Sequence, residues 1–196
     1  MTRIVRSWRR HLLFAAALLV AAAVFLPMWG LTLVSTQYPD GLRMVVYPDH
    51  IRGDIAELNA LNHYIGMTPI SDALFVELRL LPLAFGLLAL ACVAAAFVRR
   101  WWASAVPLAI MVTVAGYGFW SMTRRLYEFG HDLDPTAPIR IAPFTPPMLG
   151  TNQIAQFATY AYFSWGTFLP LLAGMIVLLV LVADLRTGRA MGRFAR

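Results

Sequence analysis

The chain has 196 residues, 60% of them hydrophobic, with a mean hydropathy of +0.66 and a formal net charge of +6. This hydrophobic content exceeds that of water-soluble domains, so we expect an integral membrane protein. All sixteen basic residues are arginines, and most lie beside apolar segments as topology determinants do, which argues against nucleic-acid binding. The single cysteine, Cys92, excludes an internal disulfide and a cysteine-based metal site.

The first apolar run covers residues 11–34 and is long enough to cross a hydrocarbon core of ~30 Å. Its basic start and alanine-rich middle leave a second interpretation open, a signal peptide cleaved near Ala21 or Ala23. Because the apolar run continues past these alanines to Val34, the sequence favours an uncleaved anchor.

Three further apolar runs follow at residues 73–98, 101–122 and 154–184. The last is so long that we expect its first turns to stand outside the hydrocarbon, with Thr151 or Asn152 as the N-cap. The sequence therefore predicts one membrane domain over residues 1–196. Its expected fold is all-α, a four-transmembrane-helix bundle with two structured extracytoplasmic loops, residues 35–72 and 123–153.

Arginine counts predict the orientation of this bundle. Four arginines precede the first run, two separate the second and third runs, and four follow the fourth run. Because arginines are enriched on the cytoplasmic side, we expect both termini in the cytoplasm and both long loops on the opposite side of the membrane.

The first long loop has the pattern of a short strand followed by an amphipathic helix. Residues 42–48 are rich in β-branched side chains and end at Pro48, which predicts an extended segment. Residues 53–65 carry apolar side chains at helical spacing, with Asp54 as the expected N-cap and Gly66 as the expected C-cap.

Candidate copper ligands lie in and around this helix. If it continues through Gly66, His63 and Met67 share one face, and imidazole with thioether suits Cu(I). His50 is an available third donor. The alternative is structural: Met67 packs on apolar surface and His63 bonds a backbone carbonyl.

The second long loop contains five prolines between residues 135 and 147. Proline excludes a long helix or a central strand, so we expect a stiff, extended segment that covers the first loop or binds a partner. His131 and Met148 add metal donors on the same side of the membrane, with Asp132 and Asp134 nearby. Alternatively, the two aspartates cap turns ahead of Pro135.

Charged residues also lie near the membrane boundaries. Glu77 and Arg79 begin the second run, and we expect an interfacial pair or, alternatively, part of a proton or ligand path. Arg124 and Arg125 are expected to pair with Glu77 or Glu128. Small residues in the second and third runs offer faces for close helix contact: Ala84, Gly86, Ala89, Gly116 and Gly118. No motif of a known catalytic site is present, so we do not expect an enzyme.

Four stretches in the two long loops are similar in sequence to a known group of proteins. They are YPDGL (38–42), LNHYIGMTPI (61–70), GHDLDPTAPIRI (130–141) and FTPP (144–147). They resemble small polytopic proteins encoded beside atypical, Sec-exported nitrous oxide reductases, over about a third of the chain. The resemblance implies a bacterial inner-membrane accessory protein that supports a periplasmic copper enzyme or its assembly factors. It also raises His50, His63, Met67 and His131 as candidate copper ligands.

Three hypotheses follow for the function. The first is this accessory role, with copper handled by the outer loops. The second is a structural subunit of a larger membrane hetero-oligomer, in which the proline-rich loop is an interface. The third is a quinol-interacting subunit that uses Glu77, Arg79 and the nearby aromatic residues.

Overall fold

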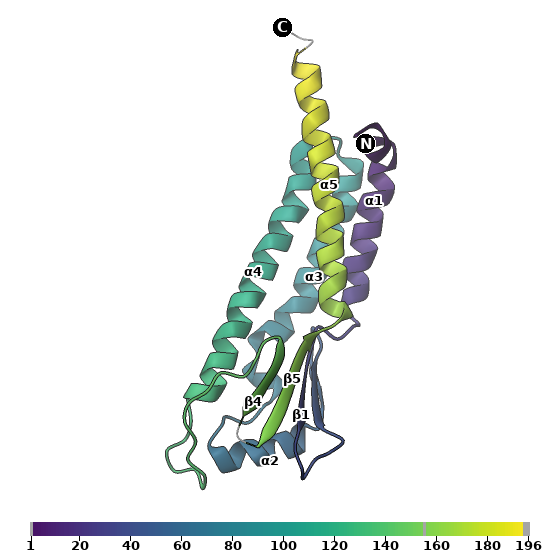
Figure 1. Ribbon diagram of the computed structural model, residues 1–196. Coiled ribbons are helices and arrows are strands. Elements are labelled where there is room, and N and C mark those ends of the chain that lie inside the picture. Colours follow the sequence, from purple (N-terminus) through teal and green to yellow (C-terminus); the bar gives the residue numbers. More distant parts are fainter. Residues whose placement is uncertain (1, 155, 194–196) are drawn as a thin grey trace.

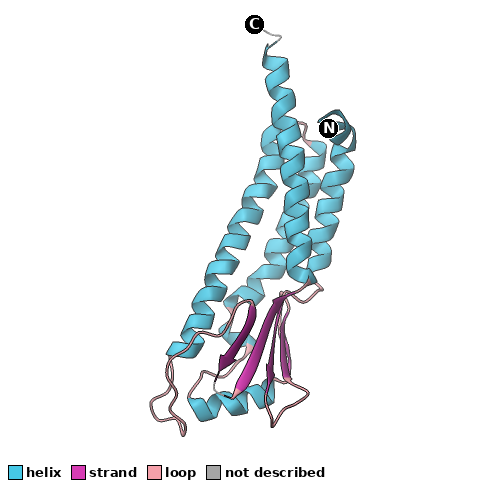
Figure 2. Ribbon diagram, in the orientation of Figure 1, coloured by secondary structure: helices cyan, strands magenta, loops and turns pink. Residues whose placement is uncertain are grey.

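A computed structural model describes residues 2–154 and 156–193. Four long helices lie side by side, and the two ends of the chain are at the same end of this bundle (Figure 1). They are α1 (Thr2–Ala23), α3 (Val76–Phe97), α4 (Trp101–His131) and α5 (Trp165–Arg193). The opposite end of the bundle carries a β-sheet and the short helix α2 (Ile55–Ile65), as Figure 2 shows. The fold is therefore mixed α/β, and the prediction of an all-α four-helix bundle is wrong.

The sheet has five antiparallel strands in the order β3-β2-β1-β5-β4. Its central pair joins the two halves of the chain, because β1 follows α1 and β5 precedes α5. The strands are β1 (Trp29–Val34), β2 (Leu42–Val46), β3 (Ile51–Gly53), β4 (Gly150–Ile154) and β5 (Phe157–Phe163). We call the sheet, α2 and the connecting segments, residues 24–75 and 132–164, the outer platform, where outer means the end of the bundle away from the two chain termini.

The first apolar run is only partly helical. Helix α1 ends at Ala23, and three tighter i→i−3 bonds carry the turn as far as Leu26. Pro27 has no backbone N–H to continue a helix, and the alternating residues that follow form β1. Because β1 bonds to strands on both sides, its backbone polar groups are paired without a helix.

The fourth apolar run also begins as a strand. In β5, the side chains of Thr159 and Ala161 are buried while those of Tyr160 and Tyr162 are exposed. This alternation is typical of a half-buried strand and cannot form one buried helical stripe. The expected N-cap residues Thr151 and Asn152 lie in β4 instead, and α5 begins at Trp165.

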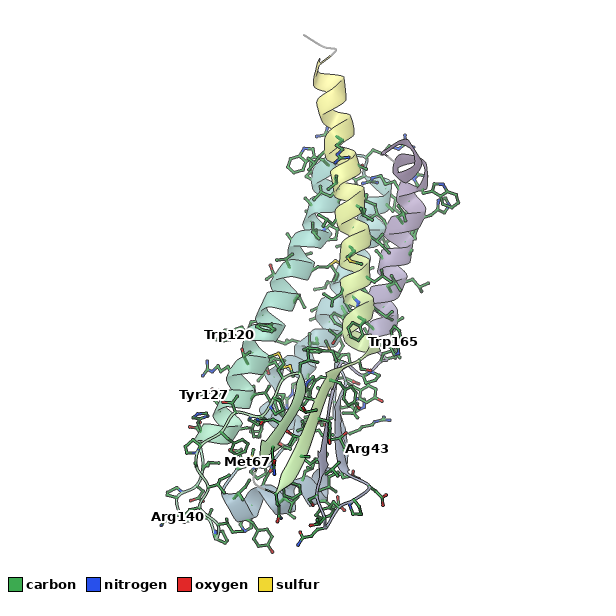
Figure 3. The ribbon with its side chains drawn as sticks, in the orientation of Figure 1. Arg43, Met67, Trp120, Tyr127, Arg140 and Trp165 are labelled. Atoms are coloured by element: carbon green, nitrogen blue, oxygen red, sulfur yellow. The ribbon has the colours of Figure 1, made fainter. Side chains whose placement is uncertain are left out.

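Helix α4 is longer than predicted and continues beyond residue 122 to His131. The 20 residues from Trp101 to Trp120 rise ~28 Å, which matches the hydrocarbon thickness. Trp120 of α4 and Trp165 of α5 lie at a similar level, as tryptophans at a membrane boundary do (Figure 3). Residues 132–149, which we call the proline-rich segment, contain no helix or strand, as their prolines predict.

Three of the described helices are long and apolar enough to cross a membrane: Val76–Phe97, Trp101–His131 and the Trp165–Arg186 part of α5. They indicate a membrane protein. Helix α1, with arginines in its first half, is not among these three candidate spans, yet it lies along α5 from end to end. At one end Arg9 contacts Asp184, and at the other the backbone N–H of Gly166 donates to Pro27 O at 2.8 Å.

The buried Arg9 ties four helices together. Its Nε donates to both carboxylate oxygens of Asp184 at 3.2 and 3.1 Å, and Nη1 donates to Ala95 O at 2.9 Å. Its Nη2 donates to Val98 O at 3.0 Å and to Ser104 Oγ at 3.1 Å. Every nitrogen of this buried guanidinium therefore has a partner, as burial of a charge requires.

The bundle core is aliphatic and comes mainly from α1, α3 and α5. Its most buried members include Leu13, Ala16, Val20, Phe85, Leu88, Cys92, Ala173, Val177 and Val180. The three glycines expected to allow close contact between helices do not make such a contact. A Cβ added to Gly86, Gly116 or Gly118 would meet no atom within 4 Å.

Candidate functional site

The predicted strand and helix of the first outer loop are present as β2 and α2. Asp54 occupies the N-cap position, but its side chain makes no capping bond, because Asp54 Oδ2 accepts the backbone N–H of Arg43 instead. At the other end, Gly66 adopts a φ of 78°, and its N–H donates back to the last turn. The helix therefore ends at Ile65, so the spacing of four does not place His63 and Met67 on one helical face.

The proline-rich segment crosses the end of α2 at this glycine. The backbone N–H of Asp134 donates to Gly66 O at 2.8 Å, and that of Ile139 donates to Tyr64 O at 2.9 Å. A Cβ on Gly66 would lie 2.8 Å from Asp134 O, so the approach depends on glycine. The two outer segments therefore meet at a defined contact, which we call the junction.

Two further contacts hold the proline-rich segment on the platform. The indole Nε1 of the buried Trp29 donates to Met148 O at 2.7 Å. The backbone N–H of Phe144 donates to Gly130 O at 3.1 Å, where a side chain in place of Gly130 would collide with the Phe144 backbone. The segment is thus fixed near its start, middle and end.

An apolar hollow of about 230 Å³ opens at the junction. Its apolar lining comes from the end of α2 and from the proline-rich segment, and two charged residues complete it. The lining residues are Ile65, Leu133, Asp134, Pro135, Ile139, Arg140 and Ile141. We call this feature the junction hollow; Figure 3 shows Arg140 at the outer tip of its proline-rich side.

Hydrogen bonds hold Asp134 in its charged form. The hydroxyl and the backbone N–H of Thr136 donate to Asp134 Oδ1 at 2.7 and 2.8 Å. These two bonds, followed by the nearby charge of His63, lower the pKa of Asp134 below its usual value. Asp134 therefore caps the turn before Thr136, which is the structural role left open as an alternative.

The four candidate copper ligands come from different elements. His63 is exposed on α2, half-buried Met67 follows Gly66, and His131 ends α4. His50 lies apart, in the turn between β2 and β3. His63 and Met67 lie beside the junction, whereas His131 precedes the proline-rich segment and His50 belongs to neither segment.

Two of these histidines already have partners. The His50 ring stacks on Tyr47 with 4.6 Å between centroids, and its Nδ1 contacts the carboxylate of Asp49, while its buried Nε2 has no hydrogen-bond partner. The His131 Nδ1 contacts Tyr127 O at 3.0 Å. Within residues 2–154 and 156–193, no three His, Cys, Asp or Glu side chains lie close enough to hold a metal ion together.

A charged network joins α3 and α4 beside the platform. The Ser121 hydroxyl donates to Glu77 Oε1 at 2.5 Å, and Arg125 lies 3.9 Å from Glu77 and 3.6 Å from Glu128. Arg124 also pairs with Glu128, at 2.6 Å. The expected pairing of these two arginines with Glu77 and Glu128 is confirmed, whereas Arg79 is exposed and forms no ion pair with the described residues.

Sequence reasoning missed the outward face of the sheet. The register places Arg43, Thr32, Tyr160 and Thr151 in one cross-strand row, and Arg52, Val45, Gly30 and Tyr162 in the next. We call the exposed part of these rows, Arg43, Arg52, Thr151, Tyr160 and Tyr162, the Tyr/Arg face. The alternation in FATYAYF was the sequence signal for its tyrosines, but it lay within an apolar run assigned to a helix.

No protein-family model matches the chain, and no curated protein or solved structure was found to match it.

Proposed function

We propose that this is a membrane-anchored accessory protein whose outer platform binds a partner protein through the junction hollow. The observation that supports it most is the fixed, preformed character of this hollow. Backbone bonds from Asp134 and Ile139 fix its walls across α2, so little conformational entropy is lost when a partner docks.

The size of the hollow also favours a protein partner. Pockets for small molecules usually enclose about 300–1,000 Å³, more than the 230 Å³ found here. A single large apolar side chain of a partner fits such a volume, and buried anchors of this kind dominate many interfaces. Asp134 and Arg140 at the hollow then supply polar contacts around the anchor.

The identity of the partner follows from the resemblance. The stretches LNHYIGMTPI and GHDLDPTAPIRI contribute all the residues that line the hollow. Their resemblance to proteins encoded beside nitrous oxide reductases favours a periplasmic copper enzyme, or one of its assembly factors, as the partner.

A photo-crosslinking amino acid in place of Arg140 tests the proposal in native membranes. We expect one protein adduct, identified by mass spectrometry as a periplasmic copper protein or its assembly factor. Ile139→Asp, which puts a charge in the hollow, should lower the adduct yield about tenfold. Leu149→Asp is the matched control, because Leu149 is an exposed aliphatic residue of the same segment outside the hollow. Equal yields from the two variants would contradict the proposal.

Copper handling is a second candidate function, favoured by the placement of His63 and Met67 at the end of α2, where the two segments meet, with His131 just before the proline-rich segment. We expect the purified protein to bind about one Cu(I), which imidazole and thioether ligands suit. The double variant His63→Ala/Met67→Ala should lose this binding, while His50→Ala, away from the junction, should retain it. Stoichiometric binding by the double variant would remove the proposed copper site.

A further inference from the structure

The Tyr/Arg face is a second surface, separate from the junction hollow. In the view of Figure 3, Arg43 lies at the opposite side of the platform from Arg140. Tyr160 and Tyr162 are each 45% exposed, and Arg43, Arg52 and Thr151 are exposed beside them. Tyrosine and arginine are, with tryptophan, the residue types most enriched at the energetic centres of protein interfaces.

The two arginines of this face have no acidic partner in the described part of the chain. The guanidinium of Arg52 lies over the Tyr47 ring, 5.6 Å from its centroid, a cation–π contact that does not use its charge in an ion pair. Arg43 contacts Asp54 only through its backbone N–H. Two exposed cations on the same face of the sheet as two exposed phenols can therefore bind carboxylates from another molecule.

Acidic residues are in excess over the rest of this end of the molecule. Nine of the ten acidic residues of the chain, all except Asp184, lie between Asp40 and Asp134, on the outer platform or close to it, and six arginines lie at the same end. The Tyr/Arg face carries two of these arginines and no acidic residue, so it is the part of this end that attracts an acidic partner. Charge of this pattern selects one docking orientation.

The position of the face favours a protein segment over a lipid surface. The strands continue in the direction of the helices, so the sheet stands upright on the bundle (Figure 1). Thr32, in the row of Arg43 and Tyr160, is three residues beyond Trp29, about 10 Å further from the bundle end. A second copy of the chain meeting face to face would place four arginines in one interface with no acidic residue of the face to pair with them, which is unfavourable.

We infer that the Tyr/Arg face binds an acidic segment of a partner protein. Carboxylates of this segment pair with Arg43 and Arg52, and its backbone or apolar atoms lie on Tyr160 and Tyr162. This inference concerns a surface that the proposed function does not use, and it stands or falls separately from the junction hollow.

The test uses the full chain in native membranes with a photo-crosslinking amino acid in place of Thr151, in the row of Arg43 and Tyr160. We expect a protein adduct whose crosslinked peptide is rich in Asp and Glu, with a yield that falls at least fivefold in Arg43→Gln/Arg52→Gln. The control Ala56→Glu/Ala60→Glu changes the net charge by the same amount on exposed positions of α2 and should leave the yield unchanged. Replacing the acidic residues of the crosslinked peptide by Lys should restore the adduct in Arg43→Glu/Arg52→Glu.

An adduct with lipid, with a second copy or with a peptide lacking acidic residues would overturn the inference. So would a yield that the two arginine replacements leave unchanged, or the absence of any adduct from position 151. The Arg140 probe separates the two proposals: a partner captured there but not at position 151 leaves the proposed function standing and removes the acidic-segment site.

Discussion

The helical bundle and the outer platform are stabilised in different ways. The bundle is held by continuous aliphatic contact between α1, α3 and α5 and by one buried ion pair, Arg9 with Asp184. The platform has few fully buried apolar residues, and backbone hydrogen bonds between distant segments hold it together. In the bundle, the substitution expected to lower stability most is therefore at the buried charge. In the platform, it is at the glycines and polar contacts where segments cross.

The largest expected effect is in the bundle. Arg9→Met leaves Asp184 without its buried partner and should lower the free energy of unfolding by about 3–5 kcal/mol. Thermal unfolding in detergent measures this loss. Arg10→Met is the matched control, because Arg10 is exposed and should change stability little. The double variant Arg9→Met/Asp184→Met should recover much of the loss; no recovery would show that the ion pair is not the reason.

In the platform, the largest expected effect is at the junction. In Gly66→Ala, the new side chain is strained at a φ of 78° and also collides with the Asp134 backbone. Gly150→Ala is the matched control, because its side chain is strained at a φ of 90° but meets no atom within 4 Å. The strain alone costs about 1–3 kcal/mol in either variant. Hydrogen exchange at the Asp134 and Ile139 amides should accelerate more in Gly66→Ala, and equal exchange would contradict the junction.

Much of the bundle could be predicted from the sequence, and much of the platform could not. Residues 76–97 and 101–122 are continuous apolar runs flanked by arginines, and both are helical. WGLTLV and FATYAYF also lie in apolar runs. They form strands and not helices because they pair with each other, although the paired residues are about 130 positions apart in the sequence. Local patterns cannot reveal such a partner, so the register that forms the Tyr/Arg face was not predictable.

The candidate site was predictable in its parts. Turn chemistry identified Gly66 as the end of α2, and the prolines identified a stiff second segment, because both signals are local. The junction hollow depends on where those two segments cross. The crossing is set by backbone hydrogen bonds from Asp134 and Ile139, and a backbone bond does not require a particular side chain, so the local sequence does not predict it.

A smaller effect is expected where the proline-rich segment ends. Trp29→Phe removes the donor to Met148 O and leaves that carbonyl unsatisfied, at a cost of about 1–2 kcal/mol. Trp165→Phe is the control, because Trp165 is 66% exposed. Exchange of the amides in residues 148–150 should accelerate only in Trp29→Phe.

The smallest expected effect is pH-dependent. Because the pKa of Asp134 is lowered in the folded protein, its charged form stabilises the turn above the pKa of the unfolded chain. This contribution is lost as the pH falls through the lowered folded pKa. Exchange of the Thr136 amide, corrected for intrinsic rate, should accelerate in strongly acidic solution; in Asp134→Ala, which lacks the accepting oxygen, it should already be fast at neutral pH. A Thr136 amide equally protected in both proteins would contradict this role.

The pairing of β1 with β5 is the central claim, because it joins the two halves of the chain in one sheet and creates the Tyr/Arg face. In a Cys92→Ala background, cysteines replacing the register partners Thr32 and Tyr160 should form a disulfide rapidly on mild oxidation. Cysteines replacing Thr32 and Thr159 point to opposite faces of the sheet and should not. A failure of the first pair, or equal crosslinking of both pairs, would contradict the sheet and with it the platform.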